Sequence, residues 1–300
     1  MTYRKDRRNF RENLYRQLFA ILSFASLAFL LGITLTLFRE GLPIFQHVSL
    51  PSFLFGKYWY PTHEPPEFGV LPLILASAMV TSGAMLVCIP LGLGTALYIN
   101  ELAGEKQRAV LKPLVEILAS IPSVVYGFFG MAIFAPFLQN LLHLPTGLCA
   151  LTASIILGVM AVPCVCSIAE DALSFVPRSF REASYALGAN RWQTLVKVVV
   201  PAAGSGIFTA FLMGTGRVIG ETMTVLMVAG GAAVIPRSFL QPVRPMSAAI
   251  AAEMGEAPVG SSHYHALFAI GLILFLITLG FSILAELLSR KFRAKLGGSL

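Results

Sequence analysis

The chain has 300 residues, of which 56% are hydrophobic and only 12% are charged. A soluble domain carries about 25% charged residues, so these proportions exclude an ordinary soluble protein. The formal net charge is +7, which keeps a nucleic-acid partner open until the charges are placed along the chain. Four cysteines in a chain of this length form no disulfide framework.

Six apolar stretches are long enough to cross a bilayer, because a spanning helix needs about 20 largely apolar residues. They lie at residues 17–38, 69–99, 114–137, 148–169, 205–234 and 265–288. Pro90, Pro122 and Pro163 fall inside three of these stretches and predict kinks. The sequence therefore predicts an all-α integral membrane protein with six transmembrane helices.

The lysine and arginine residues outside the spans predict the orientation. Seventeen of the 22 lie at the termini or in loops on one side, whereas the loops on the other side carry four. Both termini are therefore expected in the cytoplasm, and topology explains the positive charge without nucleic acid. A basic start before an apolar run is also typical of a signal peptide, but here the run of 22 residues lacks a clear cleavage site.

This topology divides the chain into a short series of segments. We expect a basic cytoplasmic N-terminus at 1–16, a first transmembrane helix at 17–38, an external segment at 39–68, a membrane core at 69–288 and a basic cytoplasmic tail at 289–300. The core contains a cytoplasmic loop at 170–203 and a second external segment at 235–264.

Both external segments contain residues with more than one interpretation. Lys57, Tyr58, Trp59 and Tyr60 indicate either an aromatic anchor at the membrane surface or a docking surface for an external partner. His263 and His265 are two residues apart, which is a weak metal signal and favours a solvated loop. No metal site is therefore predicted.

The fifth stretch contains a pair of charges at a depth where charge is costly. A central arginine costs about 2.5–3.5 kcal/mol on insertion scales, and Arg217 and Glu221 both fall in this stretch. Their i,i+4 spacing places both on one helical face, where they can pair. The pair then either fixes helix packing or holds the arginine fork toward a passing anion.

The cytoplasmic loop has the pattern of two short helices. Pro177 suits a first helical turn, Gly188 suits a left-handed helix end, and Asn190 with Gln193 forms a capping box. Phe180, Ala183, Ser184 and Leu187 are expected on one face of the first helix, and Pro201 closes the unit. This hairpin could insert into a groove on a partner protein or lie on the membrane surface.

One motif in this loop resembles a known signature. Glu182-Ala183-Ser184, Gly188 after three further residues, and Val198–Pro201 after nine more are similar to the E-A-A-x3-G-x9-I-x-L-P signature of ABC importer permeases. Serine replaces the third residue of that signature, and valines replace its isoleucine and leucine. The resemblance implies that this loop docks an ATPase through Glu182, Ala183, Ser184, Gly188 and Pro201.

Further segments resemble the PstC-type permeases of high-affinity phosphate importers. They are Phe68–Pro72, Pro122–Gly130, Gly216–Met223 and Ala251–Glu256, spread from the second span to the sixth. The resemblance implies the type I ABC importer permease fold and a location in the bacterial cytoplasmic (inner) membrane. It also implies a role for Arg217, Glu221 and Thr222 in the substrate pathway.

The same resemblance implies three kinds of protein partner in the lipid bilayer. They are a PstA-type permease forming a heterodimer, a PstB-type ATPase dimer that uses ATP and Mg²⁺, and a PstS-type external phosphate-binding protein. This chain itself is expected to bind no cofactor, because it contains no phosphate-binding P-loop. It also lacks a nucleophile elbow and an H-E-x-x-H motif, so we expect a transporter subunit and not an enzyme.

Two other transport functions remain open at this point. The first is the same architecture with another oxyanion, such as sulfate, molybdate or a phosphonate. The second is an ion-coupled secondary transporter in which Arg217 and Glu221 relay protons. The predicted docking loop argues against the second, because such a transporter needs no ATPase.

Overall fold

The computed structural model describes the backbone of residues 2–297 and the side chains of residues 15–287. Helices that are long and apolar enough to cross a membrane occupy Tyr15–Gln46, Leu71–Leu102, Ser123–Leu142, Ala150–Ser174 and Ser262–Leu287. A sixth span results if Arg191–Ala202 and Gly204–Ile219, which are bent by 70° relative to each other, count as one. The predicted all-α architecture is confirmed, with a small two-stranded sheet added at one end.

Helices α3 (Leu71–Leu97) and α7 (Ala150–Ser174) pack along each other at the centre of the molecule, and α11 (Gly204–Ile219) packs against α7. Their contact depends on small residues. A Cβ added at Gly158 would lie 2.7 Å from the Val87 Cβ and 2.8 Å from the Ala84 carbonyl oxygen. Close backbone approach of this kind is how helices pack tightly in a membrane. Both helices run through their prolines, Pro90 and Pro163, without a break.

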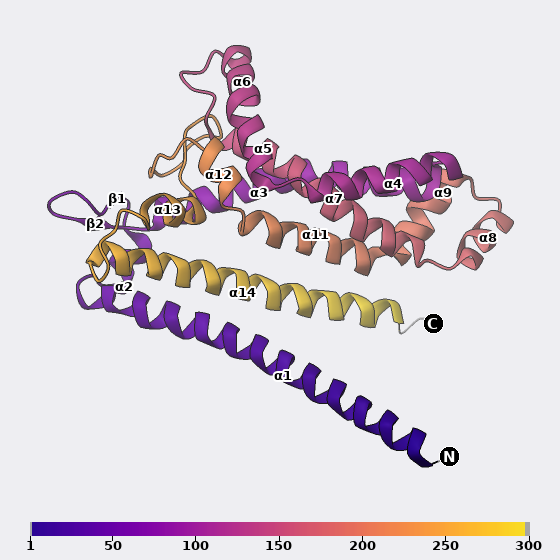
Figure 1. The fold of residues 1–300 in the computed structure, drawn as a ribbon. Coiled ribbons are helices and arrows are strands. Elements are labelled where there is room, and N and C mark those ends of the chain that lie inside the picture. The colour runs from indigo at the N-terminus through magenta and orange to yellow at the C-terminus, as the bar shows by residue number, and fades with distance from the viewer. Residues whose placement is uncertain (1, 298–300) are drawn as a thin grey trace.

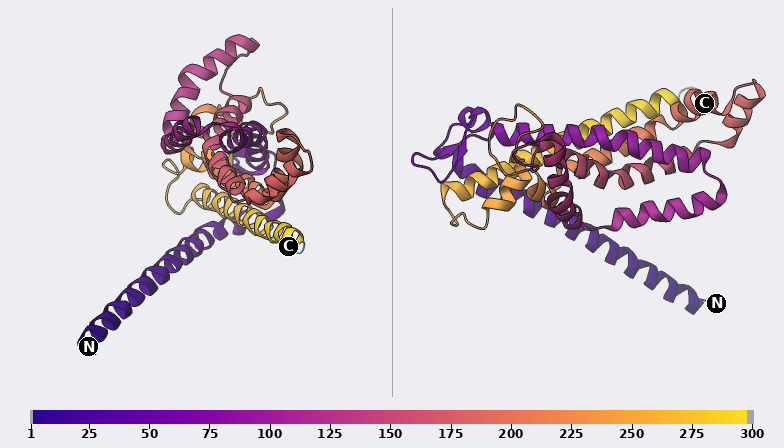
Figure 2. Two further views of the ribbon diagram at one scale, coloured as in Figure 1. Left: turned by 90° about the vertical axis from the view of Figure 1, so that its right-hand side faces the viewer. Right: turned by 90° about the horizontal axis from the view of Figure 1, so that it is seen from above.

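Helix α14 (Ser262–Gly297) lies beside α11, and α1 (Thr2–Gly41) contacts α14 near the end of the molecule that carries the sheet. From there α1 diverges from the bundle (Figure 1; Figure 2). No residue of its most apolar stretch is buried against the rest of the molecule, and the side chains of Phe24 and Phe29 are both 74% exposed. An apolar helix surface of this kind suits contact with lipid or with another membrane helix.

The third predicted span, 114–137, is wrong as a single helix. Helix α4 (Glu105–Ser120) ends before Ile121 and Pro122, and the chain continues as α5 (Ser123–Phe129), a π-helical turn and α6 (Ala135–Leu142). Ile121 and Pro122 both have extended ψ angles, 127° and 139°. Because a proline disfavours helical geometry in the residue before it, the chain breaks here.

The fifth predicted span, 205–234, is also wrong as a single helix. Helix α11 ends at Ile219, and after a short break α12 covers only Met223–Val228. Beyond α12, Gly230 and Gly231 have φ angles of +88° and +72°, which glycine adopts without steric cost and which end the helix. An irregular segment therefore follows before α13 (Met246–Glu253).

The two external segments pack into a second apolar core. A 3₁₀ turn (Leu42–Gln46), α2 (Leu50–Phe55) and the antiparallel pair β1 (Trp59–Tyr60) and β2 (Glu67–Phe68) lie against α13 and the start of α14. Trp59 is only 2% exposed, so the interpretation of this tryptophan as a membrane-surface anchor is wrong. Tyr58 and Tyr60 on either side of it are exposed.

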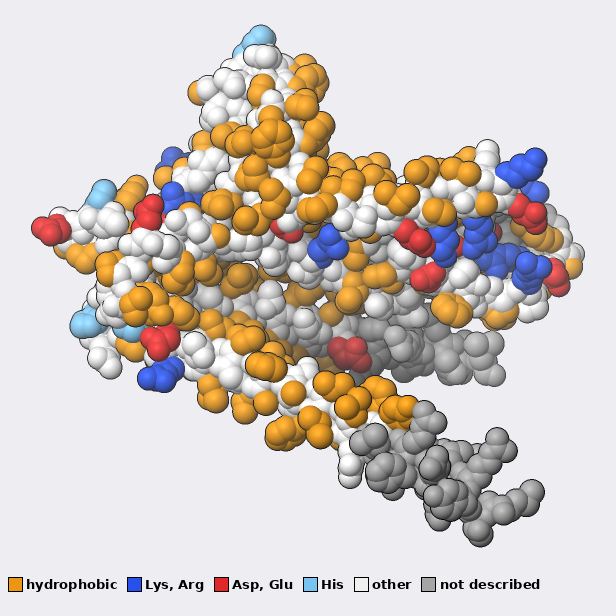
Figure 3. Space-filling view, in the orientation of Figure 1, with side chains coloured by type: hydrophobic (Ala, Val, Ile, Leu, Met, Phe, Trp, Pro, Cys, Tyr) orange, Lys and Arg blue, Asp and Glu red, His pale blue; other side chains and the backbone are white. Residues whose placement is uncertain are grey.

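The opposite end of the molecule carries the short helices of the predicted loop. These are α8 (Arg178–Ala186), α9 (Arg191–Thr194) and α10 (Val200–Ala202), with π-helical turns at Tyr98–Leu102 and Leu195–Val199. The start of α1 and the end of α14 point to the same end, as predicted for two cytoplasmic termini (Figure 1). Lysine and arginine side chains, drawn in blue, gather at this end and are sparse along the middle of the molecule, where hydrophobic side chains prevail (Figure 3). The predicted basic N-terminus continues α1, but the side chains of residues 1–14 and of the tail 289–300 lie outside the described part.

Candidate functional site

Arg217 lies in the last turn of α11, which ends about half-way along α14 (Figure 1). A cation is favoured in this position because the helix dipole is negative at its C-terminus. The side chain is exposed and lines a cavity of about 490 Å³ between α7, α11 and α14. Among the residues that the structure describes, none forms a hydrogen bond or an ion pair with this guanidinium.

The cavity beside Arg217 is mainly apolar with a few polar groups. Thr209 comes from α11, whereas Ser282 and Glu286 come from α14, and Cys164 of α7 completes the wall. Figure 3 shows a hollow between α14 and the helices above it. A charged fork in such a cavity is a suitable contact for an anion, because it can donate two parallel charge-assisted hydrogen bonds to one anion.

Glu221 does not pair with Arg217, contrary to the expectation from their spacing. The helix ends between them, and the Glu221 carboxylate accepts hydrogen bonds from the backbone N–H and hydroxyl of Thr224, at 3.3 and 3.4 Å. Ser247 of α13 donates to the Glu221 carbonyl oxygen at 2.8 Å. Glu221 therefore fixes the start of α12 and ties it to α13. Thr222 is the residue before α12, and its hydroxyl donates to the Gly220 carbonyl at 3.4 Å.

The predicted helix pair of the cytoplasmic loop is present. Pro177 precedes α8, and Gly188 follows it with a φ of +83°, as predicted for a left-handed helix end. Asn190 caps α9 through a 2.8 Å bond from the Gln193 N–H, and the Gln193 side chain accepts from the Asn190 N–H at 3.0 Å. Pro201 lies in α10, directly before the bend into α11.

The residues predicted to form one apolar face of α8 do not share one environment in the structure: some are buried and others are exposed. Ser184 is buried and shares a 2.9 Å hydrogen bond with the hydroxyl of Thr194, which joins α8 to α9. Phe180 packs against the main core, whereas Ala183 is exposed and Leu187 is 89% exposed. The expectation of a single docking face is therefore wrong, and the exposed side is the one available to a partner.

The signature residues lie on this exposed side with one exception. Glu182, Ala183, Gly188 and Pro201 are exposed, whereas Ser184 is buried. The large apolar side chains of Phe175 and Trp192 are 84% and 69% exposed near them. Exposed aromatic and aliphatic groups at the polar end of a membrane protein are typical of a protein–protein contact.

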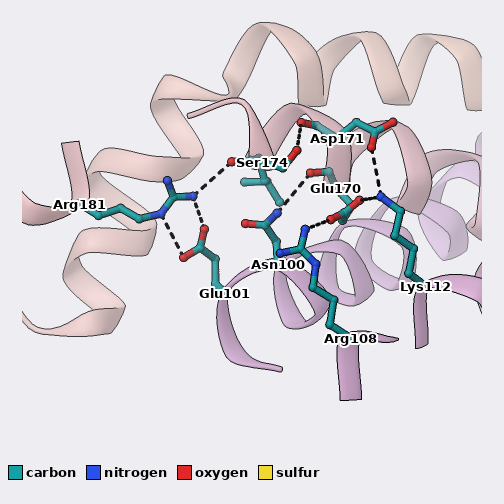
Figure 4. Close-up of polar contacts among 9 residues, drawn as sticks. Asn100, Glu101, Arg108, Lys112, Glu170, Asp171, Ser174 and Arg181 are labelled. Carbon is teal, nitrogen blue, oxygen red and sulfur yellow. Dashed lines mark hydrogen bonds and ion pairs between the residues drawn. The ribbon is translucent and has the colours of Figure 1, made fainter. Parts of the chain in front are cut away.

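Sequence reasoning missed an ionic network beneath this surface (Figure 4). Glu170 of α7 is only 2% exposed and accepts hydrogen bonds from Arg108 at 2.5 Å and Lys112 at 2.6 Å, both on α4. The hydrogen bond to Glu170 raises the pKa of Lys112 above its ordinary value. Arg181 of α8 pairs with Glu101 at 2.6 Å. Arg108 and Lys112 are one helical turn apart, and this spacing could have indicated in the sequence that both side chains bind the same carboxylate.

A second polar cluster, also missed, holds the external end together. The Glu253 carboxylate accepts from the Trp59 indole N–H at 3.0 Å, contacts the His263 ring at 2.9 Å and pairs with Arg244. His265 contacts the Glu40 carbonyl oxygen at 2.7 Å. The expectation of solvated histidines is therefore wrong. Within the described residues, no group of His, Cys, Asp and Glu side chains suits a metal ion.

Comparison with known proteins identifies the family. Residues 88–294 match the family described as binding-protein-dependent transport system inner membrane component. The probable ABC transporter permease protein YqgH of Bacillus subtilis (strain 168) is 39% identical, over 87% of this chain and 85% of that protein. The phosphate transport system permease protein PstC of Haemophilus influenzae is 32% identical, over 95% of each chain.

Solved structures show the same fold at lower sequence identity. A bacterial alginate ABC transporter, solved in complex with an alginate pentasaccharide-bound periplasmic protein, matches with a TM-score of 0.65 and 15% identity, over 91% of this chain and 94% of that one. The MetNI methionine ABC transporter in an inward-facing conformation matches with a TM-score of 0.58 and 20% identity, over 72% and 93%. The expected type I ABC importer permease fold is thereby confirmed. The chain belongs to the inner membrane components of binding-protein-dependent transport systems.

Proposed function

We propose that this chain is the transmembrane permease subunit of an ATP-driven importer of inorganic phosphate. It forms half of the translocation pathway and couples that pathway to a separate ATPase. Relatives named as phosphate transport system permeases, which match over most of both chains, support the choice of substrate. The single structural observation that carries the proposal is Arg217, an unpaired cation among the described residues that faces a cavity at the broken fifth span.

Arg217 contacts phosphate during its passage in this proposal. Its planar fork can donate two parallel hydrogen bonds to one phosphate, whereas an ammonium group acts as a point charge. One arginine holds the anion weakly enough to release it, as transport requires. Glu221 and Thr222 border the same break and keep α12 in place, so they act on the pathway through its shape.

The exposed side of α8 and α9 docks the ATPase. Glu182, Ala183, Gly188 and Pro201 are the contact residues on that side, and Ser184 holds the two helices together from within. Because α10 leads through a 70° bend into α11, a displacement of this unit reaches the helix that carries Arg217. This connection is a direct covalent route from ATPase closure to the pathway.

The remaining subunits follow from the same proposal. A PstA-type permease completes the pathway as a heterodimer, and a PstB-type ATPase dimer consumes ATP and Mg²⁺. A PstS-type phosphate-binding protein delivers phosphate to the external end, where Tyr58 and Tyr60 are exposed. The complex resides in the bacterial cytoplasmic (inner) membrane.

The test is uptake of labelled phosphate by the complete complex in proteoliposomes, with excess sulfate or molybdate as competitors. We expect Arg217→Gln to lower uptake at least about tenfold, because it removes a charge-assisted hydrogen bond to the anion. Arg237→Gln serves as the matched control, since Arg237 is exposed in the external segment away from the cavity. Equal uptake by Arg217→Gln and wild type, at equal assembly, would remove Arg217 from the pathway.

The competition arms separate the alternatives. Loss of phosphate uptake to excess sulfate or molybdate would assign the transporter to another oxyanion. Uptake that follows an ion gradient and needs no ATP would assign it to secondary transport.

A further inference from the structure

Arg181 joins the docking helix α8 to two other elements at once (Figure 4). Its guanidinium binds both carboxylate oxygens of Glu101, at 2.6 and 3.5 Å. It also donates to the backbone carbonyls of Val176 at 2.7 Å and Leu173 at 3.2 Å. Leu173 lies in the last turn of α7, whereas Glu101 lies in the π-helical turn that follows α3.

This arrangement uses properties that only arginine has. Carbonyl groups in the last turn of a helix have no partner within the helix, and Arg181 supplies one for α7. The planar guanidinium has enough fixed donors to bind a carboxylate and two carbonyls together, which a lysine cannot match. The Arg181 and Glu101 side chains are 17% and 16% exposed, so water competes little for these bonds.

The Glu170 cluster fixes the same elements from the other side. Arg108 and Lys112 bind the buried Glu170 carboxylate and so hold α4 against α7. Asn100, next to Glu101, donates to the Glu170 backbone carbonyl at 3.4 Å. The turn after α3 is thus attached both to α7 and, through Glu101, to α8.

The segment between α7 and α8 is not helical, so it does not by itself fix the angle between the two helices. Only Phe175–Pro177 separates the two helices, and Phe175 is 84% exposed. Glu182, the next residue after Arg181, points to solvent on the docking side. Arg181 therefore contacts the spans, whereas Glu182, about 100° further round α8, is exposed to a partner.

We propose that Arg181 is a positioning residue for coupling: it makes α8 move as one body with the cytoplasmic ends of α3 and α7. The inference rests on the proposed docking of an ATPase at α8. With Arg181 in place, a push on α8 displaces the spans. Without it, the segment at Phe175–Pro177 bends, and the cytoplasmic ends of α3 and α7 no longer follow α8, so only the covalent route through α10 remains.

The test compares Arg181→Gln with Lys106→Gln in the complete reconstituted complex. Lys106 lies on α4 and not on the docking helix, is exposed, and forms no ion pair among the described residues. We expect Arg181→Gln to keep ATP hydrolysis but to lower the phosphate transported per ATP at least about tenfold, the effect of losing a buried charge-assisted contact. Lys106→Gln should keep the wild-type ratio. An unchanged ratio in Arg181→Gln would overturn the inference.

Exchanging the charges of Arg181 and Glu101 distinguishes loss of their ion pair from a general folding defect. In Arg181→Glu combined with Glu101→Arg the ion pair is restored in reverse, so partial recovery of the ratio is expected relative to Arg181→Glu alone. No recovery at equal assembly would count against the Arg181–Glu101 contact as the coupling link.

Hydrogen exchange of the purified complex separates this inference from the proposed function. We expect faster backbone exchange in α8 and in the last turn of α7 for Arg181→Gln and not for Lys106→Gln. This readout needs no substrate. If the wild type accumulates no phosphate, the proposed function fails, and exchange rates equal to wild type in Arg181→Gln would overturn the inference separately.

Discussion

Ser184 illustrates how one residue that departs from a family signature can be explained by its contact. The signature has alanine at this position, whereas the Ser184 hydroxyl is buried here and meets the Thr194 hydroxyl at 2.9 Å. Thr194 is itself only 1% exposed. The two polar groups satisfy each other, so each depends on the other's presence.

A double-mutant cycle at these two positions measures that dependence. Ser184→Ala leaves a buried hydroxyl unpaired on Thr194 and should lower the free energy of unfolding by about 1–3 kcal/mol. Ser184→Ala with Thr194→Val removes both groups and should cost less than Ser184→Ala alone. Thermal unfolding of the purified chain in detergent measures the four stabilities. Additive losses would show that the two hydroxyls do not interact.

Gly188 separates two effects of substitution at the residue scale. Its φ of +83° disfavours any side chain with a Cβ, but apart from its chain neighbours no atom of the described residues lies within 4 Å of an added Cβ. Gly188→Ala and Gly188→Trp should therefore both lower the free energy of unfolding by about 1 kcal/mol, from backbone strain alone.

Only Gly188→Trp should also abolish ATP-coupled uptake, because in the proposed complex its ring would fill space that the ATPase occupies. Comparing stability with phosphate transported per ATP distinguishes the two effects. Normal coupling in Gly188→Trp would place the docking surface elsewhere.

At the scale of elements, the sequence predicted features that depend on a few neighbouring residues. The helix end at Gly188 and the capping box at Asn190 and Gln193 follow from local φ preferences and short hydrogen bonds, and both are present. At Pro122 the expected kink is a complete break between two helices, and the break after Ile219 was not predicted. Hydropathy continues across them, so a window of apolar residues indicates one helix where the backbone forms two.

The broken fifth span decides what Arg217 and Glu221 do. On an unbroken helix they would face the same way, but the break turns Glu221 toward the start of α12 and leaves Arg217 at the cavity. The hydrogen bond from Ser247 of α13 helps to hold that break. Because Ser247 is far from Glu221 in the sequence, no local pattern indicated the contact.

At the scale of the whole molecule, the external end depends on Glu253. Its carboxylate binds the Trp59 indole, Arg244 and His263, and so connects β1, α14 and the segment before α13 to α13 itself. These groups are largely shielded from water, since the Glu253 side chain is 13% exposed. Removing the Glu253 carboxylate would leave the Arg244 charge without its ion-pair partner in a site shielded from water.

Glu253→Ala should therefore destabilise the chain by about 3 kcal/mol, as for other buried ion pairs that lose one partner. Thermal unfolding and protease sensitivity of residues 39–68 in detergent measure the effect. Glu256→Ala is the control, because Glu256 is exposed near the same helix. Equal stability of the two variants would show that the cluster contributes little.

The sequence by itself determined that this is an all-α membrane protein with both termini on one side. Those properties depend on the total apolar length and on where the basic residues lie. Only the tertiary structure decided that Trp59 is buried, that Glu221 leaves Arg217 unpaired among the described residues, and that Arg181 joins α8 to α3 and α7. Trp59 and Arg181 contact segments distant in the chain, and the break that separates Glu221 from Arg217 is held by Ser247 of another helix. Such contacts arise from packing, which no local pattern of residues encodes.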